Sequence, residues 1–181
     1  RQPFGRRVGV VQLLINLSEV GAFQPNGRAV VTAQKLRLLH AGIRAIAGRH
    51  RPQYTERFGV PVNHEDMLAT IMGFSWLLID GVRRLDLPLG HDEAEDLYYL
   101  WRVFALLMGL HPEGRPHDDS YIPADLSEAA ESYASYVRRN NTMPAANPSG
   151  PVLTQDNLDM MERMLPPPLR WIGLGFAPRI L

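Results

Sequence analysis

The stretch TAQKLRLLHAGIRAIAG, residues 32–48, decides the fold of this chain. Apolar side chains recur along it at steps of three and four, and this spacing predicts an amphipathic helix with one buried face. Pro52 cannot continue a helix, so we expect the helix to run from Arg28 to about His50. The side chains that define the predicted buried face are Leu36, Leu39, Ile43, Ile46 and Ala47.

The centre of this helix holds a histidine between two arginines. Arg37 precedes His40 by three residues and Arg44 follows it by four, so the three side chains project from roughly one side of the helix. This arrangement suits an anion, or a metal with anionic groups beside it, and a haem meets both needs. Its iron would bind His40, and its propionates would bind Arg37 and Arg44. Taken alone, His40 can also be an ordinary histidine of a core or a surface, and both interpretations stay open.

The composition favours a folded domain and excludes several classes of site. With 45% apolar residues, the 181-residue chain can bury a real core, and we expect a single domain over residues 1–181. The 19 basic and 19 acidic side chains cancel, which argues against a nucleic-acid partner. The absence of cysteine excludes disulfides, thiolate metal sites and cysteine nucleophiles.

No segment of the sequence predicts a membrane span. The most apolar run, residues 67–79, is shorter than the roughly 20 residues that a span needs, and Asp80 follows it. The chain starts at Arg1 rather than at methionine, so we expect sequence to be missing upstream. No signal peptide is visible, and the location stays open between a cytoplasmic and a secreted protein.

The rest of the chain is also predicted to be helical, which makes the fold class all-α. Residues 6–20 fit a strand or a helix, and the helical surroundings favour a helix that ends near Gly21. Asn63 is expected to cap a single helix over residues 64–85, which has an acidic first turn. A loop is expected over residues 51–63. Further helices are expected at residues 92–109, 126–139 and 153–164, the last of them capped by Thr154.

Other clusters of polar residues have structural explanations. NHED at Asn63 fits helix capping, HDEAED at His91 fits compensation of a helix dipole, and HPEGRPHDD at His111 fits a polar loop. No nucleophile elbow, P-loop or dinucleotide-binding pattern occurs in a suitable context. Aromatic residues at helical spacing suit either a plain core or the wall of a cofactor site; they are Phe74, Trp76, Trp101 and Phe104.

Three segments together resemble a known family. They are KLRLLHAGIR at residues 35–44, GVPVNHEDMLATIMGFSWLLIDGVRRL at residues 59–85, and DLYYLWRVFALLMGLHPE at residues 96–113. In this order and with these short spacings, they look like the catalytic domain shared by latex clearing protein (rubber oxygenase) and the MpaB-type oxygenases. The resemblance covers residues 28–113 well and the remainder loosely.

The resemblance implies a globin-like helical bundle that encloses a b-type haem, with His40 as the axial ligand of the iron. Enzymes of the family use dioxygen to cleave carbon–carbon double bonds in isoprenoid chains, which implies an apolar substrate. A hydrophobic tunnel over the haem would be lined by a helix such as residues 67–85. Thr70 would match a threonine on the haem side of that helix.

Two functional residues of rubber oxygenases, an acidic base and a distal lysine, have no match in this chain. An acidic base of rubber oxygenases belongs to sequence upstream of the proximal histidine, so the catalytic base is not assigned here. Their distal lysine has no equivalent, because Lys35 is the only lysine and lies on the same predicted helix as His40. The remaining histidines fall in predicted loops or first turns, so we expect a haem whose second face is open to dioxygen.

Two further functions suit the same sequence. The helices can enclose a lipid-like ligand without any metal, as a binding module. They can also form an interaction domain whose apolar tail, residues 169–181, docks a partner.

Overall fold

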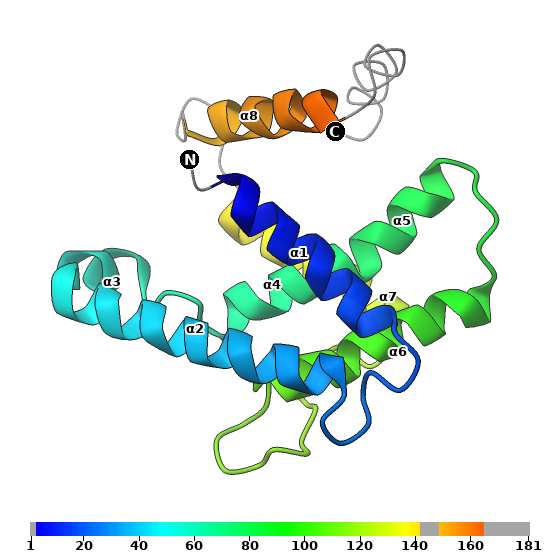
Figure 1. Ribbon diagram of the computed structural model, residues 1–181, viewed down its shortest axis with the longest axis horizontal. Helices are drawn as coiled ribbons and strands as arrows, with labels where there is room; N and C mark the ends of the chain where they lie inside the picture. Colours follow the sequence, from blue (N-terminus) through cyan, green and yellow to red (C-terminus); the bar gives the residue numbers. More distant parts are fainter. Residues whose placement is uncertain (1–2, 142–148, 165–181) are drawn as a thin grey trace. The chain divides into compact units, whose positions relative to one another are not determined.

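The protein is described here from a computed structural model, which places residues 3–141 and 149–164 (Figure 1). The regular secondary structure over these two ranges consists of α-helices joined by loops, as the sequence predicted. None of the described helices is both long enough and apolar enough to cross a membrane. The helices are α1 (Pro3–Ser18), α2 (Arg28–His50), α3 (Pro52–Phe58), α4 (His64–Phe74), α5 (Trp76–Arg84), α6 (His91–Met108), α7 (Leu126–Asn140) and α8 (Ser149–Met164).

The chain forms two compact units, Arg1–Tyr133 and Ala134–Leu181. The first unit holds α1 to α6 and the beginning of α7, and it contains every residue discussed below as part of a site. In the second unit, the structure describes the end of α7 and α8. The expectation of one domain over residues 1–181 stays a prediction, and the apolar tail at residues 169–181 lies outside the described residues.

The first two helices are joined by a tight turn. The helical option for residues 6–20 is confirmed, because α1 covers them up to Ser18. The backbone N–H of Ala29 donates to the carbonyl of Ala22 at 3.0 Å, which draws the start of α2 against the loop. A Cβ atom at Gly27 would lie 2.2 Å from that same carbonyl oxygen. Only glycine fits at this close approach, so the turn depends on Gly27.

The predicted cap at Asn63 is confirmed. Its side chain accepts a hydrogen bond from the backbone N–H of Asp66 at 2.9 Å, and the Asp66 carboxylate accepts one from the backbone N–H of Asn63 at 3.3 Å. These two bonds form a capping box, which satisfies donors that the first turn of a helix leaves open. The cap fixes where α4 begins.

The single helix expected over residues 64–85 is wrong, because Ser75 divides it into α4 and α5. Ser75 has φ −109° and ψ −87°, away from helical values. Its buried hydroxyl donates to the carbonyl of Ile71 at 2.7 Å, a bond to the preceding turn that often accompanies a bend in a helix. The apolar pattern continues through the break, so periodicity alone gave no sign of it.

Two other boundaries differ from expectation. The loop expected over residues 51–63 contains α3, which begins at Pro52, a position where the missing N–H of proline costs nothing. The last described helix begins at Ser149 rather than at residue 153. Thr154 therefore lies inside α8, and its predicted role as a cap is wrong.

The core of the first unit is built around α6, which packs against α2 and α4. Trp101 lies at its centre, stacked on Phe74 with ring centroids 5.4 Å apart and edge-on to Phe104 at 5.8 Å. Tyr98 is also buried, and its hydroxyl donates to the carbonyl of Pro123 at 2.8 Å. Burial raises the pKa of Tyr98, so the phenol stays protonated.

The buried face of α2 differs from the predicted one. Its fully buried residues are Ala29 and Ala33, whereas Leu39 and Ile46 are 57% and 63% exposed. Small alanines let α2 approach α1 and α6 closely, and the packed side of the helix follows them. The periodicity thus predicted the helix correctly and most of its buried face wrongly. Of the expected stripe, Leu36 is partly buried against the core.

Candidate functional site

His40 lies on the packed side of α2 and is half-buried. Its Nδ1 atom is buried and has no hydrogen-bond partner in the part of the chain that the structure describes. Burial, together with the positive charge of Arg44, lowers the pKa of His40. The imidazole is therefore neutral at neutral pH, the state in which histidine binds a metal. Buried polar atoms are rarely left without a partner, so this nitrogen is an exception among the described residues.

Arg37 and Arg44 are held at the two sides of His40 by backbone carbonyls. Arg37 donates from Nη1 to the carbonyl of Leu107 at 3.3 Å, and Arg44 donates from Nη1 to the carbonyl of Val62 at 3.2 Å. Neither guanidinium forms an ion pair with a carboxylate of the described residues. Each arginine therefore keeps its charge and most of its five N–H donors for an anion.

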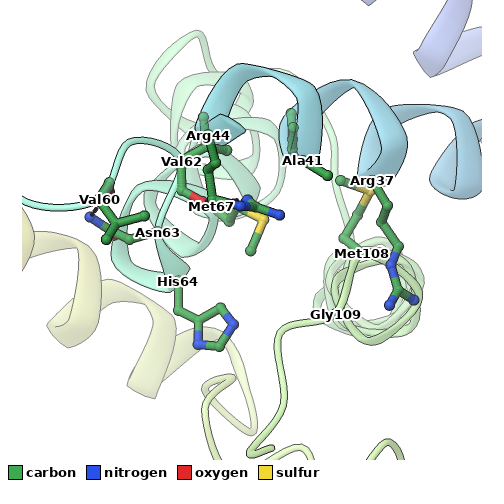
Figure 2. A pocket seen from close by; sticks show the side chains of 11 residues that line it. Arg37, Ala41, Arg44, Val60, Val62, Asn63, His64, Met67, Met108 and Gly109 are labelled. Carbon is green, nitrogen blue, oxygen red and sulfur yellow. Dashed lines mark hydrogen bonds between the residues drawn. The ribbon is translucent and has the colours of Figure 1, made fainter. Parts of the chain in front are cut away.

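These three side chains line one cavity of about 550 Å³, which we call the polar cavity. Figure 2 shows Arg44 beside Val62 and Met67, whereas Arg37 lies beside Met108 and Gly109. The two guanidiniums thus come from different turns of α2 and stand apart along the cavity. Its lining consists of Arg37, His40, Ala41, Arg44, Val60, Val62, Asn63, His64, Met67, Met108 and Gly109.

A second cavity, of about 400 Å³, adjoins the first, and we call it the apolar cavity. It is lined mainly by aliphatic and aromatic side chains of α1, α2, α4 and α6, including Leu36, Phe74 and Trp101, and Asp66 is the one acidic residue of its lining. Four residues line both cavities, namely His40, Val62, Met67 and Met108. His40 therefore stands where a charged compartment meets an apolar one, and both volumes fall in the usual range for ligand sites.

Thr70 lines the apolar cavity together with His40. Its hydroxyl donates to the carbonyl of Asp66 at 2.9 Å, one turn earlier in α4. Thr70 does not line the polar cavity that holds Arg37 and Arg44. The structure thus brings the other three residues singled out in the sequence, Arg37, Arg44 and Thr70, around His40, in two separate compartments.

Several lining residues were missed in the sequence, and His64 is the most prominent. It is the first residue of α4 and lies in the polar cavity, where Figure 2 shows its ring; it also contacts Tyr121, with ring centroids 5.5 Å apart. Its place at the start of α4 follows from the cap at Asn63, which was predicted, but the position of that end of α4 beside the polar cavity had no local signal. No group of three His, Asp or Glu side chains suitable for a bare metal ion occurs among residues 3–141 and 149–164.

Comparisons with known proteins agree with the resemblance seen in the sequence. The chain is 24% identical over 143 residues to a rubber oxygenase from Streptomyces sp. (strain K30), an alignment that covers 77% of this chain and 32% of that protein. The chain thus spans about a third of the length of this curated relative. No solved structure matches it. Residues 2–181 match the family described as ER-bound oxygenase mpaB/B'/Rubber oxygenase, catalytic domain, and the chain therefore belongs to this family.

Proposed function

We propose that this chain is the haem b-binding part of an oxygenase that acts on an apolar, isoprenoid-like substrate. The observation that carries the proposal is the position of His40, whose buried Nδ1 lacks a partner at the boundary between the two cavities. Membership of the family supports oxygenase chemistry. The name of the relative, rubber oxygenase, supports an apolar substrate for that class of protein.

The residues around His40 fit a haem. A porphyrin iron needs as little as one protein ligand, and a neutral imidazole supplies it. Arg37 and Arg44 have no carboxylate partner among the described residues and suit the two propionates of the macrocycle. The apolar cavity, with Phe74 and Trp101 in its wall, suits a flat hydrophobic group or the substrate beside it.

The chain's own residues then have three tasks. His40 would hold the iron, and the two arginines would bind the carboxylates of the group. The apolar lining orients a hydrocarbon chain and excludes water. When bound, the haem supplies the activation of dioxygen. We assign no residue as the catalytic base.

The test is a titration of the purified chain with hemin, followed by the Soret absorbance and the bound iron per chain. We expect one haem per chain, and we expect the His40→Ala variant to lose most of it, because the iron loses its protein ligand. The matched control is His91→Ala, since His91 is the exposed first residue of α6 and lines neither cavity. If His40→Ala retains full occupancy and the parent spectrum, His40 is not the ligand.

A second function is favoured by the apolar cavity alone. A lipid-like molecule of suitable size would satisfy its lining without any metal, and the chain would then be a binding module. Native mass spectrometry of the purified chain separates the two functions. A stoichiometric lipid in chains that do not take up hemin supports the binding module and contradicts the oxygenase.

A further inference from the structure

The positive charge of the chain is concentrated in one segment. Residues 28–59 carry seven of the 19 Lys and Arg residues and one of the 19 Asp and Glu residues. The whole chain is formally neutral, so the rest of it has a matching excess of negative charge. Three of the seven are exposed and have no carboxylate partner in the described ranges: Arg49 near the end of α2, Arg51 between α2 and α3, and Arg57 in α3.

Large apolar side chains are exposed on the same two helices. On α2, Leu39, Ile43 and Ile46 follow one another at steps of three and four along one side, and they are 57%, 39% and 63% exposed. Leu38 is even more exposed, at 76%. Burying one such side chain is worth about 1.5–3 kcal/mol. Exposing a row of large apolar side chains to water is unfavourable for a folded domain, so this row indicates an interaction surface.

Helix α3 adds aromatic residues at the same end of α2, against which it packs. Tyr54 and Phe58 are 45% and 60% exposed, and their rings lie 5.1 Å apart. The guanidinium of Arg57 lies over the Phe58 ring, 4.9 Å from its centroid. Aromatic rings beside arginines are typical of segments that sit at the boundary between lipid headgroups and acyl chains.

We propose that this surface binds membranes that contain anionic lipids. The lipid-binding surface consists of Leu38, Leu39, Ile43 and Ile46 of α2, Tyr54 and Phe58 of α3, and Arg49, Arg51 and Arg57. The apolar side chains enter the acyl boundary, while the arginines remain at the depth of the phosphates, which their long stems allow. A nucleic acid would match the positive charge, but it offers nothing to cover the aliphatic row on α2.

The lipid-binding surface begins next to the apolar cavity. Leu36 lines that cavity, and Leu39 and Ile43 follow it at steps of three and four on the same side of α2. An apolar substrate dissolved in the bilayer would therefore meet the protein beside the cavity. This last step rests on the proposed function, whereas membrane binding itself does not.

The test is flotation of the purified chain with vesicles. One set is phosphatidylcholine alone, and the other contains about 30 mol% phosphatidylserine, at about 0.1 M salt. We expect binding to the anionic vesicles and loss of it at high salt. The triple variant Arg49→Gln, Arg51→Gln, Arg57→Gln should bind at least about 10-fold more weakly, since one arginine near the surface is worth about 5-fold. The matched control changes two exposed arginines elsewhere, Arg83→Gln with Arg138→Gln, and should bind as the parent does.

A second pair of variants tests the apolar part. Leu39→Gln with Ile46→Gln should weaken binding about 10-fold or more, whereas Leu85→Gln with Leu87→Gln, which are exposed outside the surface, should not. All four positions are exposed, and circular dichroism checks that the variants fold. Haem uptake is measured on the same samples, so failure of the proposed function and failure of membrane binding are seen separately.

Three results would overturn the proposal. The first is no flotation with anionic vesicles, or equal flotation of the parent and both surface variants. The second is binding of a labelled single-stranded RNA, lost in the triple arginine variant, without vesicle binding. The third is a dimer in light scattering that Leu39→Gln with Ile46→Gln dissolves, again without vesicle binding, because the face would then join two copies of the chain.

Discussion

Arg37 of α2 donates a hydrogen bond at 3.3 Å to the backbone carbonyl of Leu107, a residue 70 positions later at the end of α6. The bond ties the helix that carries His40 to the central helix of the core. Directly after α6, Gly109 adopts a left-handed conformation with φ +94°, and the Arg37 guanidinium passes beside it. The end of α6 and the polar cavity therefore depend on the same few atoms.

Gly109→Ala should lower the free energy of unfolding by about 1–2 kcal/mol, because an L-residue is strained at this positive φ. Steric crowding adds little to this loss of stability, since a Cβ atom at Gly109 would lie 3.7 Å from the nearest atom of Arg37, an ordinary van der Waals contact. Urea unfolding measures the change. The matched control is Gly42→Ala inside α2, where nothing lies within 4 Å, and it should stabilise the chain by about 0.5–1 kcal/mol. Equal effects of the two changes would contradict the argument from φ.

His40 should make the stability of the chain dependent on pH. The pKa of His40 in the folded chain lies below its ordinary value of 6.5, so the unfolded chain binds this proton more readily. Above pH 6.5, His40 therefore does not change the free energy of unfolding. As the pH falls through 6.5 towards the lowered pKa, protonation of His40 in the unfolded chain makes the folded chain increasingly less stable. Urea unfolding between pH 8 and pH 5 measures this effect as the difference in free energy of unfolding between the parent and His40→Gln at each pH. A difference that stays constant with pH would show that His40 keeps its ordinary pKa.

Arg37→Gln and Arg44→Gln should each weaken hemin binding by about 1.5–3 kcal/mol, or roughly 10- to 150-fold, since each removes a charged donor to a carboxylate. The position of the Soret band should not change, because the axial ligand is intact. Arg83→Gln, outside both cavities, is the matched control. If both variants bind hemin as tightly as the parent, the two arginines do not hold the propionates.

The ferric haem should be five-coordinate or water-bound, and it should bind added cyanide or imidazole. Of the other five histidines, only His64 lines one of the two cavities, and it does so from the first turn of α4. His64→Ala should therefore leave the resting absorption and EPR spectra unchanged. A low-spin spectrum of the bis-histidine type that His64→Ala abolishes would contradict the prediction and indicate electron transfer instead.

The sequence predicted most helices from their apolar periodicity. It predicted the end of a helix where a capping residue stands close to that end in the chain. The cap predicted at Asn63 marks the start of α4, and the helix predicted over residues 92–109 matches α6 within one residue at each end. The grouping of Arg37, His40 and Arg44 was predicted for the same reason, since three- and four-residue steps on one helix put side chains together. That these three side chains share one cavity depends also on segments outside α2, because Val62, His64 and Met108 complete its lining.

The parts that could not be predicted depend on contacts between distant segments. The break at Ser75 does not interrupt the apolar pattern, so nothing local distinguishes it from a continuous helix. The packed side of α2 is the side that carries Ala29 and Ala33. Alanine is only weakly hydrophobic, so these two positions contribute little to the apolar pattern from which a buried face is predicted. His64 lies in the polar cavity because the segment just before α4 returns to α2, where the Val62 carbonyl accepts a hydrogen bond from Arg44, and nothing in the local sequence predicts this long-range contact.

The stacking of Trp101 on Phe74 in the wall of the apolar cavity has an optical consequence. Trp101 is almost completely buried, so its indole ring emits from surroundings of protein side chains rather than from water. An occupant of that cavity that absorbs near the tryptophan emission would accept the excitation energy and darken the protein, whereas a saturated hydrocarbon would leave it bright. The chain thus carries an intrinsic probe that distinguishes a light-absorbing occupant of the cavity from a saturated occupant or an empty cavity.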